Sequence, residues 1–306
     1  GKTVSLFTET VENWRDWARV FQNKAAFTPL AREIFRREGL PWTELSPLTP
    51  GTNGVFRCGD VVVKIFFPRE SGLDPTADYH TELAAARQGA AWGIPTPPVL
   101  GHGMVKDRYD FYYLLTAYSP GKEAGDWLAG SSGKQQEHFV EQLQTLLARL
   151  HRPTGVLSPR DLRQEARENP RLKKLAPSLR EEMLARLEGL ELKGLVLTHG
   201  DLTGENLLVQ EDGSLVVIDW ADAHLAPAWY ELGPLAFELF QGQGELLRLF
   251  AGADQEAFVE RLLDCCCLHD FGADFLWNFW QREGAPEFGS LEEVRKLLEK
   301  KLAGAE

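Results

Sequence analysis

Residues 195–223 read LVLTHGDLTGENLLVQEDGSLVVIDWADA and form the most informative stretch of the chain. Two apolar runs, Leu207–Val209 and Leu215–Ile218, flank an Asp212-Gly213 pair. Short apolar runs joined by such a pair predict a β-hairpin. The hairpin separates two groups of polar residues, one before its first strand and one after its second.

Asp201 and Asn206 lie in the loop before this hairpin, and Asp219 follows its second strand. A hairpin of this length returns Asp219 to the neighbourhood of Asn206, so both side chains can bind one metal ion. Carboxylate and amide oxygens are hard ligands of the kind that Mg²⁺ prefers, with phosphate oxygens and water completing the octahedron. Each residue alone more often caps a loop, but the three in this order favour a catalytic site.

The order and spacing of these residues resemble the catalytic loop of kinases, in which H-x-D-x-x-x-x-N is followed by a metal-binding Asp. Gly200 and the I-D-W-x-x-A ending narrow the resemblance to the aminoglycoside phosphotransferase / choline kinase-like family. The resemblance is specific over about 30 residues and extends more weakly over 45–240. It implies an α+β, protein-kinase-like two-lobed fold. A small antiparallel β-sheet lobe joins a larger, mainly helical lobe, and Mg-nucleotide binds in the cleft.

The resemblance also implies a role for each residue of the loop. Asp201 would orient the acceptor hydroxyl and take its proton, while Asn206 and Asp219 would hold Mg²⁺ on the phosphates of ATP. His199 is interpreted as structural, its imidazole bracing the loop. Glu231 stands where the family commonly has an Asp, and we expect it to anchor the loop through a partner that the sequence does not identify.

Lys64 lies in the apolar run Val61–Phe67, and strand alternation places it on one face with Val62 and Phe66. An ammonium among apolar neighbours is costly unless it meets an anion. By resemblance that anion is the α/β-phosphate pair, with Glu82 of the next helix holding Lys64 in place. The alternative is a lysine whose ammonium reaches solvent and a solvated helix glutamate.

Two further segments complete the nucleotide site that the resemblance implies. The phosphate-covering loop corresponds to Gly51-Thr52-Asn53-Gly54, whose glycines would let backbone N–H groups approach phosphate oxygens. The inter-lobe hinge corresponds to Thr116-Ala117-Tyr118, whose backbone would hydrogen-bond a purine. Any hairpin could use the first of these segments, so its position just before the Lys64 strand is what favours a function.

The acceptor site is expected in the C-terminal helices, where Asp270, Asp274 and Trp277 lie in an otherwise apolar segment. Asp270 and Asp274 are four residues apart and therefore expected on one helix face. Carboxylates beside tryptophans can hold an ammonium by charge and by cation–π attraction. An amphipathic helix with a solvated acidic face and core aromatics explains the same pattern, and both interpretations stay open.

The remaining chain supplies a coarse domain plan. A helix is expected at about 76–92, and long helices at about 228–250 and 254–283. The turn residues Ser119-Pro120-Gly121 separate strand-rich from helix-rich sequence. We therefore expect an N-terminal nucleotide-binding lobe with leading helices over 1–118 and a C-terminal lobe with the catalytic loop and acceptor site over 119–306.

Composition excludes several classes of protein. The 306 residues carry a formal net charge of −12, which disfavours nucleic acid and anionic membranes as partners. No apolar run reaches the roughly 18 residues of a membrane span, and a secretory signal is not evident. The consecutive cysteines Cys265, Cys266 and Cys267 cannot readily pair with one another, and we interpret them as reduced core thiols of a cytoplasmic protein. Oligomeric state cannot be read from the sequence.

Together these features predict a small-molecule kinase that transfers the γ-phosphoryl group of ATP to a hydroxyl, with Mg²⁺ as cofactor. An aminoglycoside-like or choline-like cationic acceptor and a sugar-like acceptor are all compatible with the motifs. A non-catalytic nucleotide-binding protein on the same fold is the main alternative. A protein kinase is less favoured, because the H-R-D arginine and the D-F-G glycine are both absent.

Overall fold

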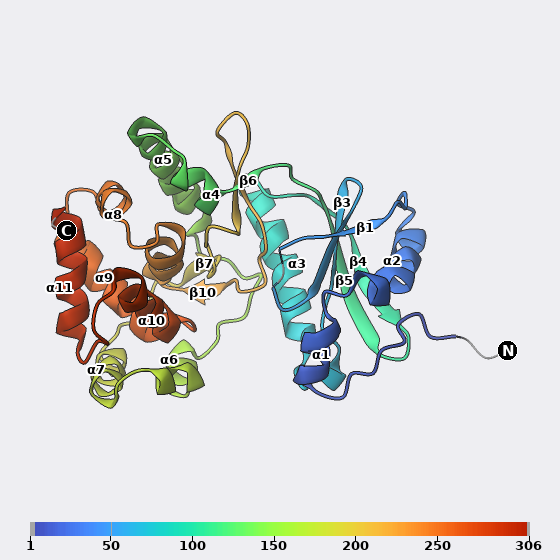
Figure 1. Ribbon diagram of the computed structural model, residues 1–306, viewed down its shortest axis with the longest axis horizontal. Coiled ribbons are helices and arrows are strands. Elements are labelled where there is room, and N and C mark those ends of the chain that lie inside the picture. Colours follow the sequence, from blue (N-terminus) through green and yellow to red (C-terminus); the bar gives the residue numbers. More distant parts are fainter. Residues whose placement is uncertain (1–3, 50, 305–306) are drawn as a thin grey trace. The chain divides into compact units, whose positions relative to one another are not determined.

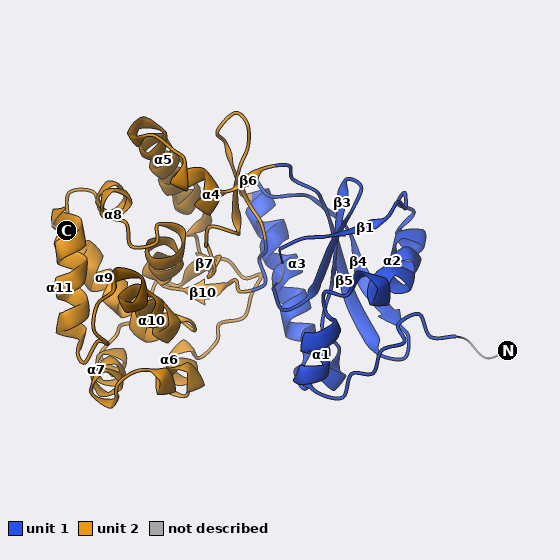
Figure 2. Cartoon of the chain, in the orientation of Figure 1, with its two compact units in different colours: residues 1–91, 95–120, 219–221 blue, residues 92–94, 121–218, 222–306 orange. Residues whose placement is uncertain are grey.

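The computed structural model describes residues 4–49 and 51–304, and these pack as two compact units (Figures 1 and 2). Unit 1 contains the described residues up to Ala91, together with Pro95–Pro120 and Asp219–Ala221. Unit 2 contains Trp92–Ile94, Gly121–Ile218 and Asp222 onward. The small antiparallel sheet of unit 1 and the helices of unit 2 give the protein-kinase-like fold that the sequence predicted.

Unit 1 is built on an antiparallel sheet with the strand order β1-β2-β3-β5-β4. The strands are β1 (Leu45–Pro47), β2 (Gly54–Cys58), β3 (Val61–Ile65), β4 (Val99–Lys106) and β5 (Asp110–Ala117). The β2–β3 hairpin turns at Gly59, where φ is +62°. A left-handed backbone of this kind costs glycine little and other residues more, which explains why the turn uses Gly-Asp.

Helices cover both faces of this sheet (Figure 1). An aromatic core that includes Trp17, Phe27 and Phe56 packs between one face and α1 (Trp14–Val20) and α2 (Lys24–Glu38). On the other face, Phe66 and Leu114 pack against Tyr79 and Leu83 of α3 (Pro75–Ala91). A short helical turn, η1 (Arg69–Ser71), precedes α3. Strand alternation therefore turns Lys64 toward the α3 face, together with Phe66.

Unit 2 combines short strands with helices. The hairpin of β8 (Leu207–Val209) and β9 (Leu215–Val217) turns at Gly213, and β6 (Lys122–Glu123) pairs with β8. A second two-stranded sheet joins β7 (Val196–Thr198) to β10 (His224–Ala226). The helices between β6 and β7 are α4 (Ala124–Ala129), α5 (Gly133–Leu150), α6 (Leu162–Arg167), η2 (Pro170–Lys174) and α7 (Pro177–Glu188). After them come η3 (Ala228–Glu231), η4 (Pro234–Leu239), α8 (Gly244–Ala251), α9 (Gln255–Leu268), α10 (Gly272–Glu283) and α11 (Leu291–Ala303).

The single helix expected over 254–283 is wrong, because α9 and α10 are separate helices. His269 ends α9 with an extended backbone, at ψ 141°. A Cβ on Gly272 would lie 1.9 Å from the carbonyl oxygen of Cys266, so only glycine lets α10 start this close to α9. Asp270 lies in the turn between the helices, and the expectation that Asp270 and Asp274 share one helix face is also wrong.

The long helix expected over 228–250 is wrong as well. The segment divides into η3, the π-helical η4 and α8. Gln241 and Gly242 both adopt left-handed backbones, with φ of 52° and 68°, which a continuous α-helix does not allow. Buried apolar residues occur in all three of these elements, which is why the segment has the composition of one long helix.

Cys265, Cys266 and Cys267 are buried in α9, which confirms their prediction as core residues. Cys265 also joins two elements. Its Sγ accepts the N–H of Gly233 and donates to the carbonyl of Tyr230, both at 3.2 Å. Across residues 4–49 and 51–304, no helix combines the length and the hydrophobicity that a membrane crossing requires.

Candidate active site

The loop after β7 carries the first group of predicted residues, and His199 shapes it. The imidazole Nδ1 accepts the N–H of Asp201 at 3.1 Å, so the proton is on Nε2, which donates to the carbonyl of Ile218 at 2.9 Å. This arrangement supports the structural interpretation of His199. Gly200 follows with φ +84°, and a Cβ there would lie 2.4 Å from the carbonyl oxygen of Asp222. The glycine of the motif is therefore required sterically.

Asp201 and Asn206 are brought together within unit 2. The Asn206 amide Nδ2 donates to the Asp201 carbonyl at 2.9 Å and to its carboxylate Oδ2 at 3.0 Å. The carboxylate is thereby held in one orientation at the surface of the loop. The N–H of Ile218 donates to the Asn206 carbonyl at 3.0 Å, which fixes Asn206 next to the residue that precedes Asp219 in sequence.

Glu231 fixes the same loop by accepting hydrogen bonds from its backbone. Its fully buried carboxylate accepts the N–H of Gly200 at 2.7 Å, the N–H of His199 at 3.1 Å and the Nε2 of His151 at 2.8 Å. Burial alone would raise the pKa of Glu231, but the hydrogen bond and charge of His151, with the loop amides, lower it below its usual value. His151 is the anchor's partner that the sequence did not identify.

A second support of the loop was not predicted. His269, at the end of α9, donates from Nε2 to the carbonyl of Gly200 at 2.7 Å, while its Nδ1 accepts the N–H of Phe271 at 2.9 Å. The ring of Tyr230 stacks on His269 at a centroid distance of 4.3 Å. Sequence offers no periodic signal for a contact between residues 69 positions apart.

In unit 1 the predicted Lys64 and Glu82 form a buried ion pair, with Lys64 Nζ 2.6 Å from Glu82 Oε1. Lys64 Nζ also lies 3.2 Å from Asp219 Oδ1. Burial alone would lower the pKa of Lys64, but the two carboxylates raise it above its usual value. Lys64 is therefore charged at neutral pH and holds two predicted site residues together.

Asp219 has a strained backbone, with φ +61°. A left-handed conformation at a residue other than glycine costs roughly 1–3 kcal/mol, and such strain concentrates at functional sites. The next residue fixes the segment: Trp220 Nε1 donates to Thr96 Oγ1 at 3.0 Å. Gly89 of α3 leaves room for this indole, since a Cβ there would lie 2.8 Å from the ring.

The predicted phosphate loop is tied down at two places. Trp17 Nε1 donates to the carbonyl of Thr52 at 2.8 Å, and Asn53 Oδ1 accepts the N–H of Phe67 at 3.0 Å. Asn53 is buried and its side chain serves the loop itself, whereas Gly51 is exposed. Gly54 begins β2, where a Cβ would lie 3.0 Å from the Phe21 carbonyl oxygen.

The predicted hinge lies at the end of β5, where its amides already have partners. The N–H of Ala117 donates to the Pro98 carbonyl at 3.1 Å, and the N–H of Tyr118 donates to the Asp60 carbonyl at 2.8 Å. Thr116 pairs with Val62 in the sheet. A purine at this segment would therefore meet carbonyl oxygens or the next amide, that of Ser119.

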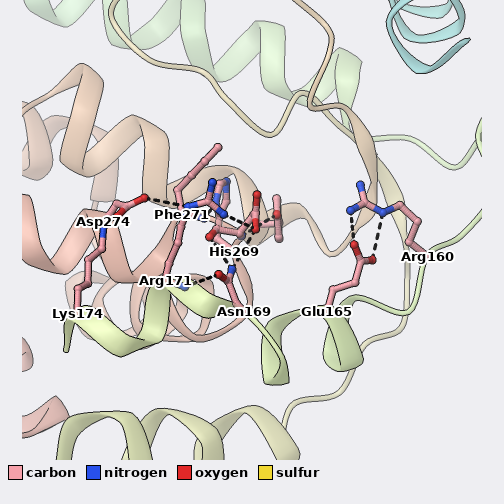
Figure 3. Close-up of polar contacts among 10 residues, drawn as sticks. Arg160, Glu165, Asn169, Arg171, Lys174, His269, Phe271 and Asp274 are labelled. Atoms are coloured by element: carbon pink, nitrogen blue, oxygen red, sulfur yellow. Dashed lines mark hydrogen bonds and ion pairs between the residues drawn. The ribbon is translucent and has the colours of Figure 1, made fainter. Parts of the chain in front are cut away.

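The predicted acceptor residues Asp270 and Asp274 lie in one polar cluster of unit 2 (Figure 3). Arg171 contacts both carboxylates, with Nη1 3.1 Å from Asp270 Oδ1 and Nε 3.3 Å from Asp274 Oδ2. Lys174 forms a further ion pair with Asp274. Trp277 is not part of this cluster and packs edge-on against Trp280 at 5.0 Å.

Asn206 and Asp219 each carry the kind of oxygen ligand that Mg²⁺ prefers. Within residues 4–49 and 51–304, no three His, Cys, Asp or Glu side chains converge as a metal site. Asn206 Oδ1 accepts no hydrogen bond within the same residues and is a hard oxygen, as are those of the Asp219 carboxylate. Two protein oxygens supplemented by phosphate and water are typical of Mg²⁺ and unlike a closed zinc or calcium site.

Two buried histidines give unit 2 a pH-dependent stability. Burial lowers the pKa of His224 to about 4 and that of His269 to about 3. Below about pH 6.5 the unfolded chain therefore binds protons that the folded chain does not, so stability falls as pH falls.

We expect the free energy of unfolding to drop by about 2 kcal/mol per histidine between pH 7 and 5. In denaturant titrations His269→Gln should flatten this slope, and the same change at exposed His138 should not; equal slopes would contradict the assignment.

Comparison with known proteins agrees with these features. The Phosphotransferase enzyme family matches residues 45–265. The GDP complex of wild-type aminoglycoside 2'-phosphotransferase-IIIa has a TM-score of 0.60 and 18% identity, covering 92% of this chain and 99% of that chain. A thermostable mutant of aminoglycoside phosphotransferase APH(4)-Ia, in a complex with ADP and hygromycin B, has a TM-score of 0.58 and 15% identity, covering 90% and 98%.

A choline/ethanolamine kinase family protein from Mesorhizobium loti has a TM-score of 0.53 and 18% identity, covering 90% of this chain and 93% of that chain. No curated protein matches the sequence. The family match, over residues 45–265, identifies the chain as a phosphotransferase. The chain belongs to the Phosphotransferase enzyme family, and the resemblance inferred from residues 195–223 is confirmed.

Proposed function

We propose that the protein is a small-molecule kinase that transfers the γ-phosphoryl group of ATP to a hydroxyl of its acceptor. The observation that carries the proposal is the Asp201 carboxylate held by the Asn206 amide on a loop fixed by Glu231. A carboxylate held in this way can accept a proton from a hydroxyl as the hydroxyl attacks phosphorus. Asp201 is therefore the proposed catalytic base and aligning group.

Unit 1 would contribute the groups that bind nucleotide. The Lys64 ammonium, held by Glu82, would contact the α- and β-phosphates, with the exposed backbone of Gly51 and Thr52 nearby in the phosphate loop. The segment Thr116-Ala117-Tyr118 would meet the purine through its carbonyls, with the Ser119 amide as the available donor. GDP and ADP complexes of the similar structures support a purine nucleotide as donor.

Asn206 and Asp219 would hold Mg²⁺, which neutralises phosphate charge when it is bound. The work of this chain is then positioning and electrostatic stabilisation, since phosphoryl transfer demands little covalent chemistry from the protein. Asp270, Asp274 and Trp277 stay the proposed acceptor residues. The hydroxyl that they would orient could belong to a cationic or to a sugar-like molecule.

The direct test is nucleotide- and Mg²⁺-dependent phosphorylation of a panel of aminoglycosides, amino alcohols and sugars, detected by mass spectrometry with ATP and GTP in parallel. We expect one acceptor class to gain a phosphoryl group with ATP. Nucleotide binding without transfer to any acceptor would instead support the non-catalytic alternative. Transfer to polypeptides alone would support the protein-kinase alternative.

Glu231 provides a prediction about loop positioning. Glu231→Gln keeps the size of the side chain but places an amide N–H₂ group where three N–H donors now converge. At least one of these bonds is lost, and a buried donor without a partner costs about 1–3 kcal/mol. We expect kcat to fall at least about tenfold with a smaller change in the nucleotide KM. Glu245→Gln at the start of α8 is the control, and equal kcat values for the two variants would contradict the assignment.

A further inference from the structure

The carboxylates expected to bind an ammonium already have cationic partners. The charge-balanced cluster consists of Arg171 and Lys174 of η2 with Asp270 and Asp274 (Figure 3). Two positive and two negative side chains make its net charge zero. Asn169 strengthens it, donating from Nδ2 to the Asp270 carbonyl at 2.8 Å and to Asp270 Oδ1 at 3.0 Å.

A second ion pair lies beside this cluster, and its one positive and one negative side chain also give a net charge of zero. Arg160 binds Glu165 through both Nε and Nη2, as Figure 3 shows. Arg160 is close enough to Asp270 and to Tyr230 to interact with both electrostatically. Arg171 adds a stacking surface, since its guanidinium lies 4.7 Å from the ring of Phe271. The surface therefore offers guanidinium donors, carboxylate acceptors and an aromatic face without excess charge.

The charge-balanced cluster is joined directly to the proposed catalytic loop. The residue before Asp270 is His269, whose Nε2 donates to the carbonyl of Gly200, adjacent to Asp201. The N–H of Asp270 donates to the Tyr230 hydroxyl at 3.2 Å, and Tyr230 stacks on His269. These bonds all lie within unit 2. They set the cluster in a fixed position relative to the group that would align the acceptor hydroxyl.

One buried acceptor lies next to these groups. His224 is nine-tenths buried and packs edge-on against Tyr230 at 4.5 Å. Its Nδ1 bonds to the carbonyl of Asp222, so Nε2 is the unprotonated nitrogen, and Nε2 has no hydrogen-bond partner within residues 4–49 and 51–304. Its charged neighbours include Arg160, which disfavours a second cation here.

From these contacts we infer that the acceptor is an uncharged polyhydroxylated molecule, sugar-like or cyclitol-like, and not a polycationic amine. This inference rests on the proposed function and specifies its acceptor. A polyol can accept from the guanidinium groups and donate to the carboxylates while the ion pairs stay intact. An ammonium would enter a cluster whose carboxylates already have Arg171 and Lys174 as cationic partners, so it would gain less attraction there than beside an unpaired carboxylate.

The test compares acceptors that differ in one group: glucose with glucosamine, galactose with galactosamine, and kanamycin as a polycation. Phosphoryl transfer from Mg-ATP is measured with mass spectrometry, and binding is measured by calorimetry with AMP-PNP present. We expect the neutral member of each pair to have the higher kcat/KM or affinity, by about tenfold. Kanamycin should be the poorest acceptor.

Lys174→Met tests the cause of this preference. It removes one cation from the charge-balanced cluster and leaves Asp274 paired with Arg171, giving the cluster a net charge of −1. The amine-to-sugar ratio of kcat/KM should rise about tenfold. Lys173→Met is the matched control, because Lys173 belongs to the same short helix and is exposed without an ion pair in the described chain. Its ratio should equal that of the wild type.

Three outcomes overturn the inference. They are a wild-type preference for the amine members, an unchanged ratio in Lys174→Met, and no binding of either neutral sugar at millimolar concentration while AMP-PNP binds. The first two leave the proposed kinase function intact, since transfer still occurs. Failure of the proposed function has a different signature, namely loss of nucleotide binding or an equal yield of product in Asp201→Asn.

Discussion

Asp201→Asn is expected to lower kcat by about 10²–10⁴-fold while leaving the fold and nucleotide binding in place. The substituted amide has the same shape, and its oxygen can still accept the bond that Asn206 Nδ2 now donates at 3.0 Å. The substitution removes the negative charge and, with it, the ability to take a proton from the acceptor. Steady-state kinetics with Mg-ATP, nucleotide titration and thermal unfolding together separate these effects.

The matched control is Asp110→Asn, an exposed residue at the start of β5 that makes the same chemical change. Its kcat should equal that of the wild type. Comparable activity in both variants would remove Asp201 from the chemistry. A large rise in the nucleotide KM for Asp201→Asn would instead place the residue in nucleotide binding.

Lys64→Met is expected to have the largest effect on stability, together with loss of activity. The substitution leaves the buried Glu82 carboxylate without its ammonium, and breaking a buried ion pair from one side costs about 3–5 kcal/mol. It also removes the proposed contact with the nucleotide phosphates. Denaturant unfolding of the variant should therefore show a lower midpoint, and ATP titration should show weak or no binding.

The double variant Lys64→Met, Glu82→Met separates stability from function. Replacing both partners by apolar side chains of similar size is often neutral or stabilising, so most of the lost stability should return. Nucleotide binding should not return, because no ammonium is present. Recovery of full activity in the double variant would show that Lys64 has only a structural role.

The parts of the fold that the sequence predicted are those with local signals. The β2–β3 hairpin follows from two apolar runs and a Gly-Asp turn, and the β8–β9 hairpin follows in the same way. A lysine in an apolar strand indicates only that an anion is needed, and Glu82 was expected beside Lys64 because of the family resemblance. Local pattern was sufficient for the two hairpins, whereas the ion pair required the family resemblance as well.

The helix boundaries after residue 228 could not be predicted from apolar spacing. The break between α9 and α10 depends on the close approach of Gly272 to Cys266, which is a property of packing. The break before α8 depends on a left-handed Gln241, a conformation that this residue type rarely signals. Burial on several sides made the hydrophobic pattern continuous where the helices are not.

Long-range polar contacts were equally hidden. The cations that pair with Asp270 and Asp274 come from a segment about a hundred residues earlier. A charge-rich segment such as η2 is usually interpreted as solvent-exposed surface, because its ion-pair partners cannot be recognised in the sequence. The sequence could therefore identify Asp270 and Asp274 as candidate acceptor residues, but it could not show that Arg171 and Lys174 already neutralise their charge.

The buried cysteines give each unit its own chemical reporter. Cys58 is buried in β2 of unit 1, and Cys265, Cys266 and Cys267 are buried in α9 of unit 2. Burial raises the pKa of Cys267 to about 12 and holds those of Cys265 and Cys266 above their usual value, so these thiols resist alkylation in the folded protein. Opening of either unit would release thiols at known positions. Mass-resolved alkylation across a denaturant series can thus time the melting of the two units separately, without an added label.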